Sequence, residues 1–244
     1  MKRVFYFLIL FSLLGCNPKD CFESTGIIIQ KEISLPVFDK INVGDEVSMI
    51  IKQGAVQKVV LETGDNLIND VTVEVVNGKL FVADNNSCNF TREYAVTKVY
   101  VTAPNITEIR SNTARNIISD GIITYPKLTL ISEDFNENAL NIGDFNMHIA
   151  NQAIKIISNG NSIFTINGTT ANLAIGFYSG SSRFIGSELV ATNIAIVHKS
   201  TNDMLLHPIN RLEGDIFSIG DVISYQHPNS INIREHYTGR LIFN

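Results

Sequence analysis

A short sequence pattern occurs four times between residues 153 and 226, at intervals of about 20 residues. Each copy begins with alternating apolar positions, passes through a corner rich in Gly, Ser, Asn and Asp, and resumes with a second apolar alternation. The copies start at Ile154, Leu173, Ile194 and Leu212. Alternation with a period of two predicts strands, and its regular recurrence predicts a repeat protein whose turns stack. A single turn cannot bury its apolar face alone, so we expect the copies to fold together.

The rest of the chain also has a β pattern. Alternating segments continue upstream, and Asn77-Gly78 lies between two of them, which is a strong signal for a tight hairpin. We therefore expect an all-β fold. Residues 105–244 are predicted to form a right-handed parallel β-helix, or β-solenoid, with rungs of about 20 residues. Residues 37–104 are predicted to form an N-terminal β region that extends or caps it.

The first residues resemble a bacterial lipoprotein signal. Two basic residues precede an apolar run that is too short to span a bilayer, and this run ends at Leu13-Leu14-Gly15-Cys16. The resemblance implies that residues 1–15 are removed, that Cys16 is lipidated, and that residues 16–36 form a tether. Asn17 in place of Asp then favours the outer membrane, facing either the periplasm or the exterior. The alternative is a buried cysteine beside an ordinary secretory signal.

Cys21 and Cys88 are the two cysteines that remain after lipidation. An exported compartment permits disulfides, and an even number of cysteines allows one bridge between them. Two free thiols are the alternative, because the sequence does not show that the two residues lie close together.

The charge of the chain argues against nucleic-acid binding. The formal net charge is −5, and the 19 Lys and Arg residues are not clustered. Neutralising a phosphate backbone requires clustered cations.

Several short motifs follow one another in an order that resembles a known family. They are Phe38-x-x-Ile41, Lys52-Gln53-Gly54, Glu62-Thr63-Gly64-Asp65-Asn66-Leu67, Asn77-Gly78-x-Leu80, Val99-x-Val101-Thr102-x-Pro104 and Gly220-Asp221-Val222-x-x-Tyr225-x-x-Pro228. Together they resemble the putative auto-transporter adhesin head GIN domain family, over about residues 37–244. The resemblance implies a parallel β-helix-like fold on exported proteins, which are frequently lipoproteins of Bacteroidetes-type bacteria.

Asp203 and Asp221 are the candidate metal ligands. If the rungs stack, these two residues lie on successive rungs roughly 5 Å apart. Together with Ser162 and Ser182 they form a predicted polar column, with an uncertainty of one residue in register. Two close carboxylates either repel or hold a hard cation such as Ca²⁺. The alternative is that each carboxylate accepts backbone amide hydrogens at its corner, as Asp commonly does in turns.

The remaining motifs do not point to a reaction, and no catalytic residue is assigned. The aromatic residues Phe177, Tyr178, Phe184, Phe217 and Tyr225 form a sugar-stacking surface if they point outward, and core if they point inward. The leading hypothesis is a non-catalytic, adhesin-like envelope lipoprotein that offers a flat sheet face to a glycan or a protein. The alternatives are a β-helix carbohydrate-active enzyme, a calcium-assisted glycan-binding protein, and a structural envelope component. Beyond calcium no cofactor is expected; the expected partners are the membrane, a glycan or protein ligand, and further copies of the chain.

Overall fold

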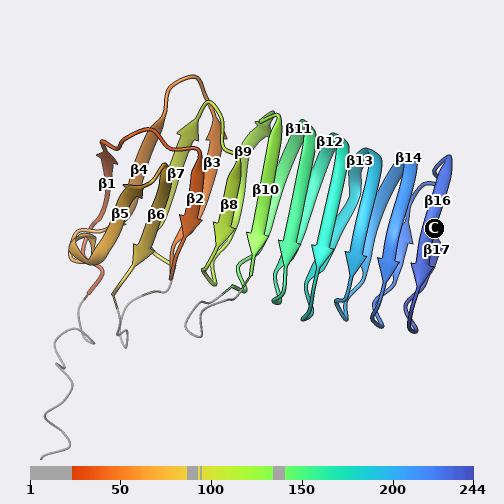
Figure 1. Ribbon diagram of the computed structural model, residues 1–244. Helices are drawn as coiled ribbons and strands as arrows, with labels where there is room; N and C mark the ends of the chain where they lie inside the picture. The colour runs from red at the N-terminus through yellow and green to blue at the C-terminus, as the bar shows by residue number, and fades with distance from the viewer. Residues whose placement is uncertain (1–23, 87–92, 94, 134–140) are drawn as a thin grey trace, which may run out of the picture.

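The computed structural model describes residues 24–86, 93, 95–133 and 141–244 (Figure 1). The expectation of an all-β chain is confirmed, since this part contains 17 strands and one 3-10 helical turn, Ile68–Asp70. The strands are β1 (Ile28–Ile33), β2 (Lys40–Val43), β3 (Ser48–Gln53), β4 (Lys58–Gly64), β5 (Val71–Val76), β6 (Lys79–Asp84), β7 (Lys98–Ala103), β8 (Glu108–Ser111), β9 (Ile117–Ile123), β10 (Lys127–Ser132), β11 (Phe145–Ser158), β12 (Ile163–Phe177), β13 (Arg183–His198), β14 (Met204–Ile216), β15 (Val222–Ser224), β16 (Ser230–Glu235) and β17 (Leu241–Phe243).

The strands are arranged in two rows that share the long strands β11 to β14. The first half of β11 pairs with β9, and its second half pairs with β10, so this strand passes from one row to the other. The first row runs β1-β4-β7-β3-β9 and continues through the first halves of the long strands to β15 and β17. The second row runs β5-β6-β2-β8-β10 and continues through their second halves to β16.

The repeat predicted from the sequence sets the register of the second row. Ile154 pairs with Leu173, Leu173 with Ile194, and Ile194 with Leu212, all in parallel. Ile231 of β16 continues the same column. From β8 to β17 every pairing is parallel, and Figure 1 shows these turns side by side.

Strand orientation is mixed at the N-terminal end. The pairs β1–β4, β4–β7 and β5–β6 are antiparallel. The predicted hairpin is present, because β5 and β6 are joined by Asn77 and Gly78 with φ of 51° and 74°. Positive φ at both turn positions fits the right-handed twist of the two flanking strands.

The N-terminal strands do not stack in chain order. In the second row β2 lies between β6 and β8, so residues 40–43 pair on one side with 79–82 and on the other with 108–111. In the first row β3 likewise lies between β7 and β9. After β1 the chain therefore forms an inner turn with β2 and β3, leaves it to build β4 to β7 outside, and returns with β8 (Figure 1).

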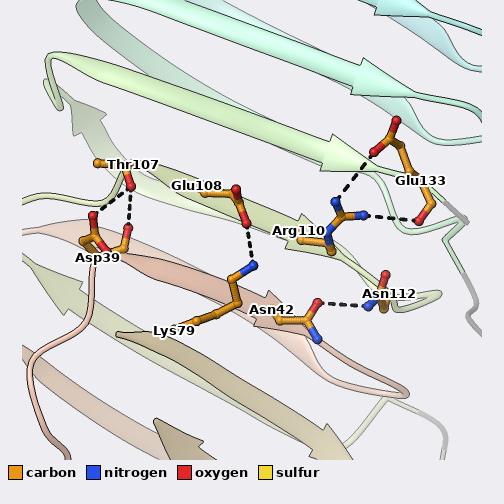
Figure 2. A network of polar contacts seen from close by, with 8 residues as sticks. All are labelled: Asp39, Asn42, Lys79, Thr107, Glu108, Arg110, Asn112 and Glu133. Carbon is orange, nitrogen blue, oxygen red and sulfur yellow. Dashed lines mark hydrogen bonds and ion pairs between the residues drawn. The ribbon is translucent and has the colours of Figure 1, made fainter. Parts of the chain in front are cut away.

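Polar contacts connect β2 to its neighbours on the outward side of the second row (Figure 2). The ammonium of Lys79 in β6 reaches over β2 to the carboxylate of Glu108 in β8, at 2.7 Å. At one end of β2 the Thr107 hydroxyl donates to Asp39 at 3.0 Å, and at the other Asn112 donates to Asn42 at 2.9 Å. Two of these contacts therefore hold the inserted strand to the β8 side, and the third joins β6 to β8 across it.

The core lies between the two rows. In the strands between the two ends of the rows, alternate residues point inward and are buried, with the rings of Phe145 and Phe164 stacked at a centroid distance of 4.9 Å. At one corner of the turns the inward positions hold buried serines. The hydroxyls of Ser132 and Ser162 are 2.7 Å apart, as are those of Ser158 and Ser182. These four serines can occupy the apolar interior because each of their hydroxyls has a hydrogen-bond partner.

Candidate ligand groove

An open groove of about 530 Å³ crosses the outward side of the second row, from β10 to β14. It runs across the strands, so each turn contributes residues at equivalent positions. Its lining consists of Lys127, Leu128, Thr129, Ala153, Ile154, Lys155, Asn172, Leu173, Ala174, Asn193, Ile194, Ala195, Asn210, Arg211 and Glu213. We call this the β10–β14 groove.

The floor of the groove is low because two consecutive turns place alanine at an outward position. Lys155 pairs with Ala174, Ala174 with Ala195, and Ala195 with Glu213. In the middle of the groove there is therefore no side chain beyond Cβ in this column. Toward β2, by contrast, the same face is covered by long charged side chains such as those of Lys79 and Glu108 (Figure 2).

One wall of the groove is a ladder of asparagine side chains. The Nδ2 of Asn193 donates to Oδ1 of Asn172 at 3.2 Å, and that of Asn210 donates to Oδ1 of Asn193 at 3.1 Å. Asn229 continues the ladder by donating to Asn210 at 3.3 Å. A carboxamide has two N–H donors and an oxygen that accepts two hydrogen bonds. Each residue in the ladder is thus held in place while part of its hydrogen-bonding capacity stays available.

The opposite side of this face carries aromatic rings. The ring of Tyr178 lies over Gly176, where an added Cβ would be 2.6 Å from ring atom Cζ, and the residue is 47% exposed. Two turns on, Phe217 stacks on His236 at 4.3 Å, with the ammonium of Lys199 5.2 Å from the Phe217 ring centre. The glycine thus provides room for Tyr178 to lie flat beside the floor of the groove.

The carboxylate of Asp215 fixes the end of this aromatic column. It accepts hydrogen bonds from Arg234 at 2.7 and 2.6 Å, and its Oδ1 lies 2.7 Å from Nε2 of His236. These contacts, that with Arg234 first, lower the pKa of Asp215 to about 2. Asp215 is therefore ionised and paired at neutral pH.

The predicted metal ligands lie outside the groove. Asp203 and Asp221 are on successive turns, as expected, but each accepts a backbone N–H of the next turn: that of Asp221 at 2.9 Å and that of Arg240 at 2.8 Å. This is the arrangement of the alternative interpretation. In the described part of the chain, no three His, Cys, Asp or Glu side chains gather in a way that could hold a metal ion. Calcium binding by the two carboxylates stays a prediction.

The two serines of the predicted polar column lie one residue away from it, which is within the register uncertainty of that prediction. Ile163 pairs with Arg183, and Phe184 pairs with Met204, so Arg183 rather than Ser182 precedes Asp203 in the column. Ser162 and Ser182 are instead buried in the interior. Successive side chains of a strand point to opposite faces, so a shift of one residue moves a side chain from the outward side into the core.

The aromatic candidates divide between the core and the surface. Phe177 and Phe184 are fully buried, whereas Tyr178, Phe217 and Tyr225 are exposed. The asparagine ladder was missed by sequence reasoning, although its members recur with the period of the turns. Cys16, Cys21 and Cys88 lie outside the described residues, so lipidation and the disulfide stay predictions.

A model of the family described as putative auto-transporter adhesin, head GIN domain, matches residues 37–228. The chain belongs to this family. The resemblance inferred from the short motifs is thereby confirmed. No curated protein gives a significant match to this head GIN sequence. Within the described residues, no helix has the length and apolar character needed to cross a membrane.

Solved structures share the fold of this head GIN protein at low sequence identity. A putative adhesin from Bacteroides fragilis has a TM-score of 0.80 at 15% identity, with 91% of this chain and 100% of that chain covered. A putative adhesin from Parabacteroides distasonis has a TM-score of 0.66 at 15% identity, with the same coverage. A protein from the same organism described as a putative lipid binding protein has a TM-score of 0.60 at 13% identity, covering 90% of this chain and 99% of that chain.

Proposed function

We propose that this protein is a non-catalytic, adhesin-like module of the cell envelope that binds a glycan in the β10–β14 groove. The observation that carries the proposal is the ladder of Asn172, Asn193 and Asn210 beside a floor of Ala174 and Ala195. Carboxamides in fixed orientations match the paired donors and acceptors of sugar hydroxyls. The small floor residues leave room for the sugar rings to approach the sheet.

The charges in the groove favour binding over cleavage. Glycoside hydrolysis generally requires a pair of carboxylates on either side of the scissile bond. The lining residues of the groove include one carboxylate, Glu213, whose oxygen lies 3.7 Å from the guanidinium of Arg211. A groove of this composition can hold a sugar chain, but its described lining residues do not include the second carboxylate that such a reaction uses.

The scaffold of the proposed module is a β-solenoid over residues 105–244, with a right-handed winding. The continuous parallel register from β8 to β16 supports it, as do the columns of equivalent residues in each turn. In such a scaffold successive turns are about 4.8 Å apart. The asparagine ladder then presents similar groups at regular intervals, which suits a polymer with a repeating unit.

We also propose that Cys16 anchors the module to the outer membrane through lipid. The lipobox-like sequence before Cys16 supports this, and the family description as a putative auto-transporter adhesin is in keeping with an exported protein. The test is mass spectrometry of the N-terminal peptide from wild type and from Cys16→Ser. A diacylated peptide beginning at Cys16, absent from the variant, is expected. A peptide that begins elsewhere, or an unmodified Cys16, would contradict the anchor.

The glycan proposal is tested on an array of bacterial, plant and host glycans. Wild type is compared with Asn193→Ala, which breaks the middle of the ladder, and with Asn146→Ala. Asn146 is an exposed asparagine of β11 on the first row, and so serves as the matched control. We expect wild type and Asn146→Ala to bind the same glycans, and Asn193→Ala to bind at least tenfold more weakly with an unchanged melting temperature. Failure of wild type to bind any glycan would refute the proposal, as would full binding by Asn193→Ala.

A further inference from the structure

The two lysines at one end of the β10–β14 groove have no carboxylate partner among the described residues. Lys127 and Lys155 both line the groove, on the neighbouring strands β10 and β11. Lys127 pairs with Ala153, so Lys155 lies diagonally from it, roughly 8 Å away across the two strands. Among the other described lysines, four have a carboxylate partner, including Lys79 with Glu108 at 2.7 Å and Lys98 with Glu62 at 2.9 Å. Within the described residues Lys31, Lys40 and Lys199 lack one too, but they do not line the groove.

Charge is distributed unevenly along the groove. Its middle, formed by Ala174 and Ala195 with Asn172 and Asn193, carries no charge. At its far end the two charges form an ion pair, with a carboxylate oxygen of Glu213 3.7 Å from the guanidinium of Arg211. Because Glu213 is paired with Arg211 and lies beyond the neutral middle, it does not pair with the two lysines. Both ammonium groups are therefore available for an incoming ligand. The protein as a whole has a net charge of −5, so these lysines do not reflect a generally basic surface.

We propose that the glycan bound in the groove is acidic, a polysaccharide whose sugar carboxylates are held by Lys127 and Lys155. This inference rests on the proposed function and specifies the class of ligand. The neutral hydroxyls of the same chain lie along the asparagine ladder, over the alanine floor. From Lys155 to Glu213 there are three turn spacings, ~14 Å, which sets the length of chain that the groove accommodates.

A carboxylate held by two ammonium groups near the surface contributes modestly, and its contribution is screened by salt. An acidic glycan should therefore bind more tightly than its neutral form, and the difference should shrink as the salt concentration rises. Hydrogen bonds to the asparagines and contact with the alanines should depend much less on salt. The two contributions can thus be separated by experiment.

The test uses one polymer in two forms, oligogalacturonate with free carboxylates and the same oligomer fully methyl-esterified. Binding to the full chain is measured by calorimetry at low and at physiological salt. The variants are Lys155→Ala, Lys127→Ala/Lys155→Ala and the control Lys31→Ala, which removes an exposed lysine of β1. We expect wild type and Lys31→Ala to bind the free acid at least tenfold more tightly than the ester. The double variant should bind both forms alike.

The outcomes separate this inference from the function on which it rests. Equal binding of both forms by wild type, or discrimination retained by the double variant, would overturn the acidic ligand and leave the glycan groove intact. The same holds if wild type binds neither form but binds a neutral glycan on the array. If no glycan of either kind binds, the proposed function itself fails and this inference fails with it.

Discussion

The side chain of Asp203 accepts the backbone N–H of Asp221, which lies in the next turn, at 2.9 Å. The same contact recurs along the chain, because Asp221 accepts the N–H of Arg240 at 2.8 Å and Asp144 accepts that of Ile163 at 2.8 Å. Each carboxylate therefore satisfies the amide at which the next strand begins. The repeated aspartates thus hold the start of each following strand against the preceding turn.

Substituting Asp203 tests this capping role. Asp203→Ala removes the acceptor and leaves the Asp221 N–H without a partner, which should lower the free energy of unfolding by about 1–2 kcal/mol. Asp203→Asn keeps an oxygen in the same place and should cost well under half as much. Urea denaturation followed by circular dichroism measures both. Equal losses in the two variants would show that the charge, and not the acceptor, is what matters.

The effect of Ca²⁺ on the melting temperature tests separately whether Asp203 and Asp221 bind a cation. If Asp203 and Asp221 hold a cation, millimolar Ca²⁺ should raise the melting temperature of wild type, and Asp203→Asn should lose this increase. If the two residues serve only as acceptors of amide hydrogens, Ca²⁺ should leave both melting temperatures unchanged.

The buried imidazole of His198 should make the protein sensitive to acid. His198 is fully buried, and within the described part of the chain neither ring nitrogen has a hydrogen-bond partner in good geometry. Burial lowers its pKa to about 4; the backbone of Gly220 and the charges of Asp203 and Asp221 oppose this shift without outweighing it. Between pH 6.5 and about 4, His198 therefore binds a proton in the unfolded chain but stays neutral in the folded protein. Stability should be full above pH 6.5 and fall by on the order of 3 kcal/mol by pH 4.

His198→Phe is the matched control for this acid sensitivity. The equivalent residue in the preceding turn is Phe177, so the column already accommodates a phenylalanine. Guanidinium denaturation at several pH values should show a smaller loss of stability between pH 6.5 and 4 in His198→Phe than in wild type. Identical pH profiles would show that other groups cause the loss.

Two glycines with positive φ should differ sharply in their tolerance of alanine. Gly214 has φ of 135°, and a Cβ there would lie 1.9 Å from the carbonyl oxygen of Ile196. Gly121 has φ of 87°, but a Cβ there would meet nothing within 4 Å. We expect Gly214→Ala to cost on the order of 3 kcal/mol or more, and Gly121→Ala about 1 kcal/mol from backbone strain alone. Denaturation midpoints measure the difference, and similar costs would mean that the neighbouring turn gives way.

The periodicity of the C-terminal half allowed its strand register to be predicted from the sequence. Positions such as Leu173 and Ile194 recur at nearly constant spacing, and each turn contacts its neighbours in the chain, so aligning the repeats also aligns the strands. In this alignment Gly214 interrupts an inward column, opposite Ile196. The serines were harder to place, because the corners vary in length and a shift of one residue exchanges the inside for the outside.

The strand pairing of the N-terminal half could not be predicted in the same way. Strand β2 pairs with β6 and β8, so its partners lie far along the chain and no repeat relates them. A short segment such as 40–43 has an apolar alternation that fits many partners equally well. The groove illustrates the same difficulty at a site. Asn172 and Asn193 occupy one column, but Asn210 joins their ladder across an irregularity of register.

The ion pair that spans β2 should stabilise the inserted strand measurably. Lys79 and Glu108 lie 2.7 Å apart, with their side chains only 26% and 23% exposed, whereas Lys52 and Asp120 form a pair at 2.9 Å that is 58% and 56% exposed. Because a partly buried pair is less screened by water, we expect a double-mutant cycle to give about 1 kcal/mol for Lys79 and Glu108, and below ~0.5 kcal/mol for the control pair. Raising the salt concentration should reduce the control coupling more. If the two couplings are equal, the pair over β2 acts as an ordinary surface contact, and the strand is held by its backbone ladders, its core residues and the hydrogen bonds of Asp39 and Asn42.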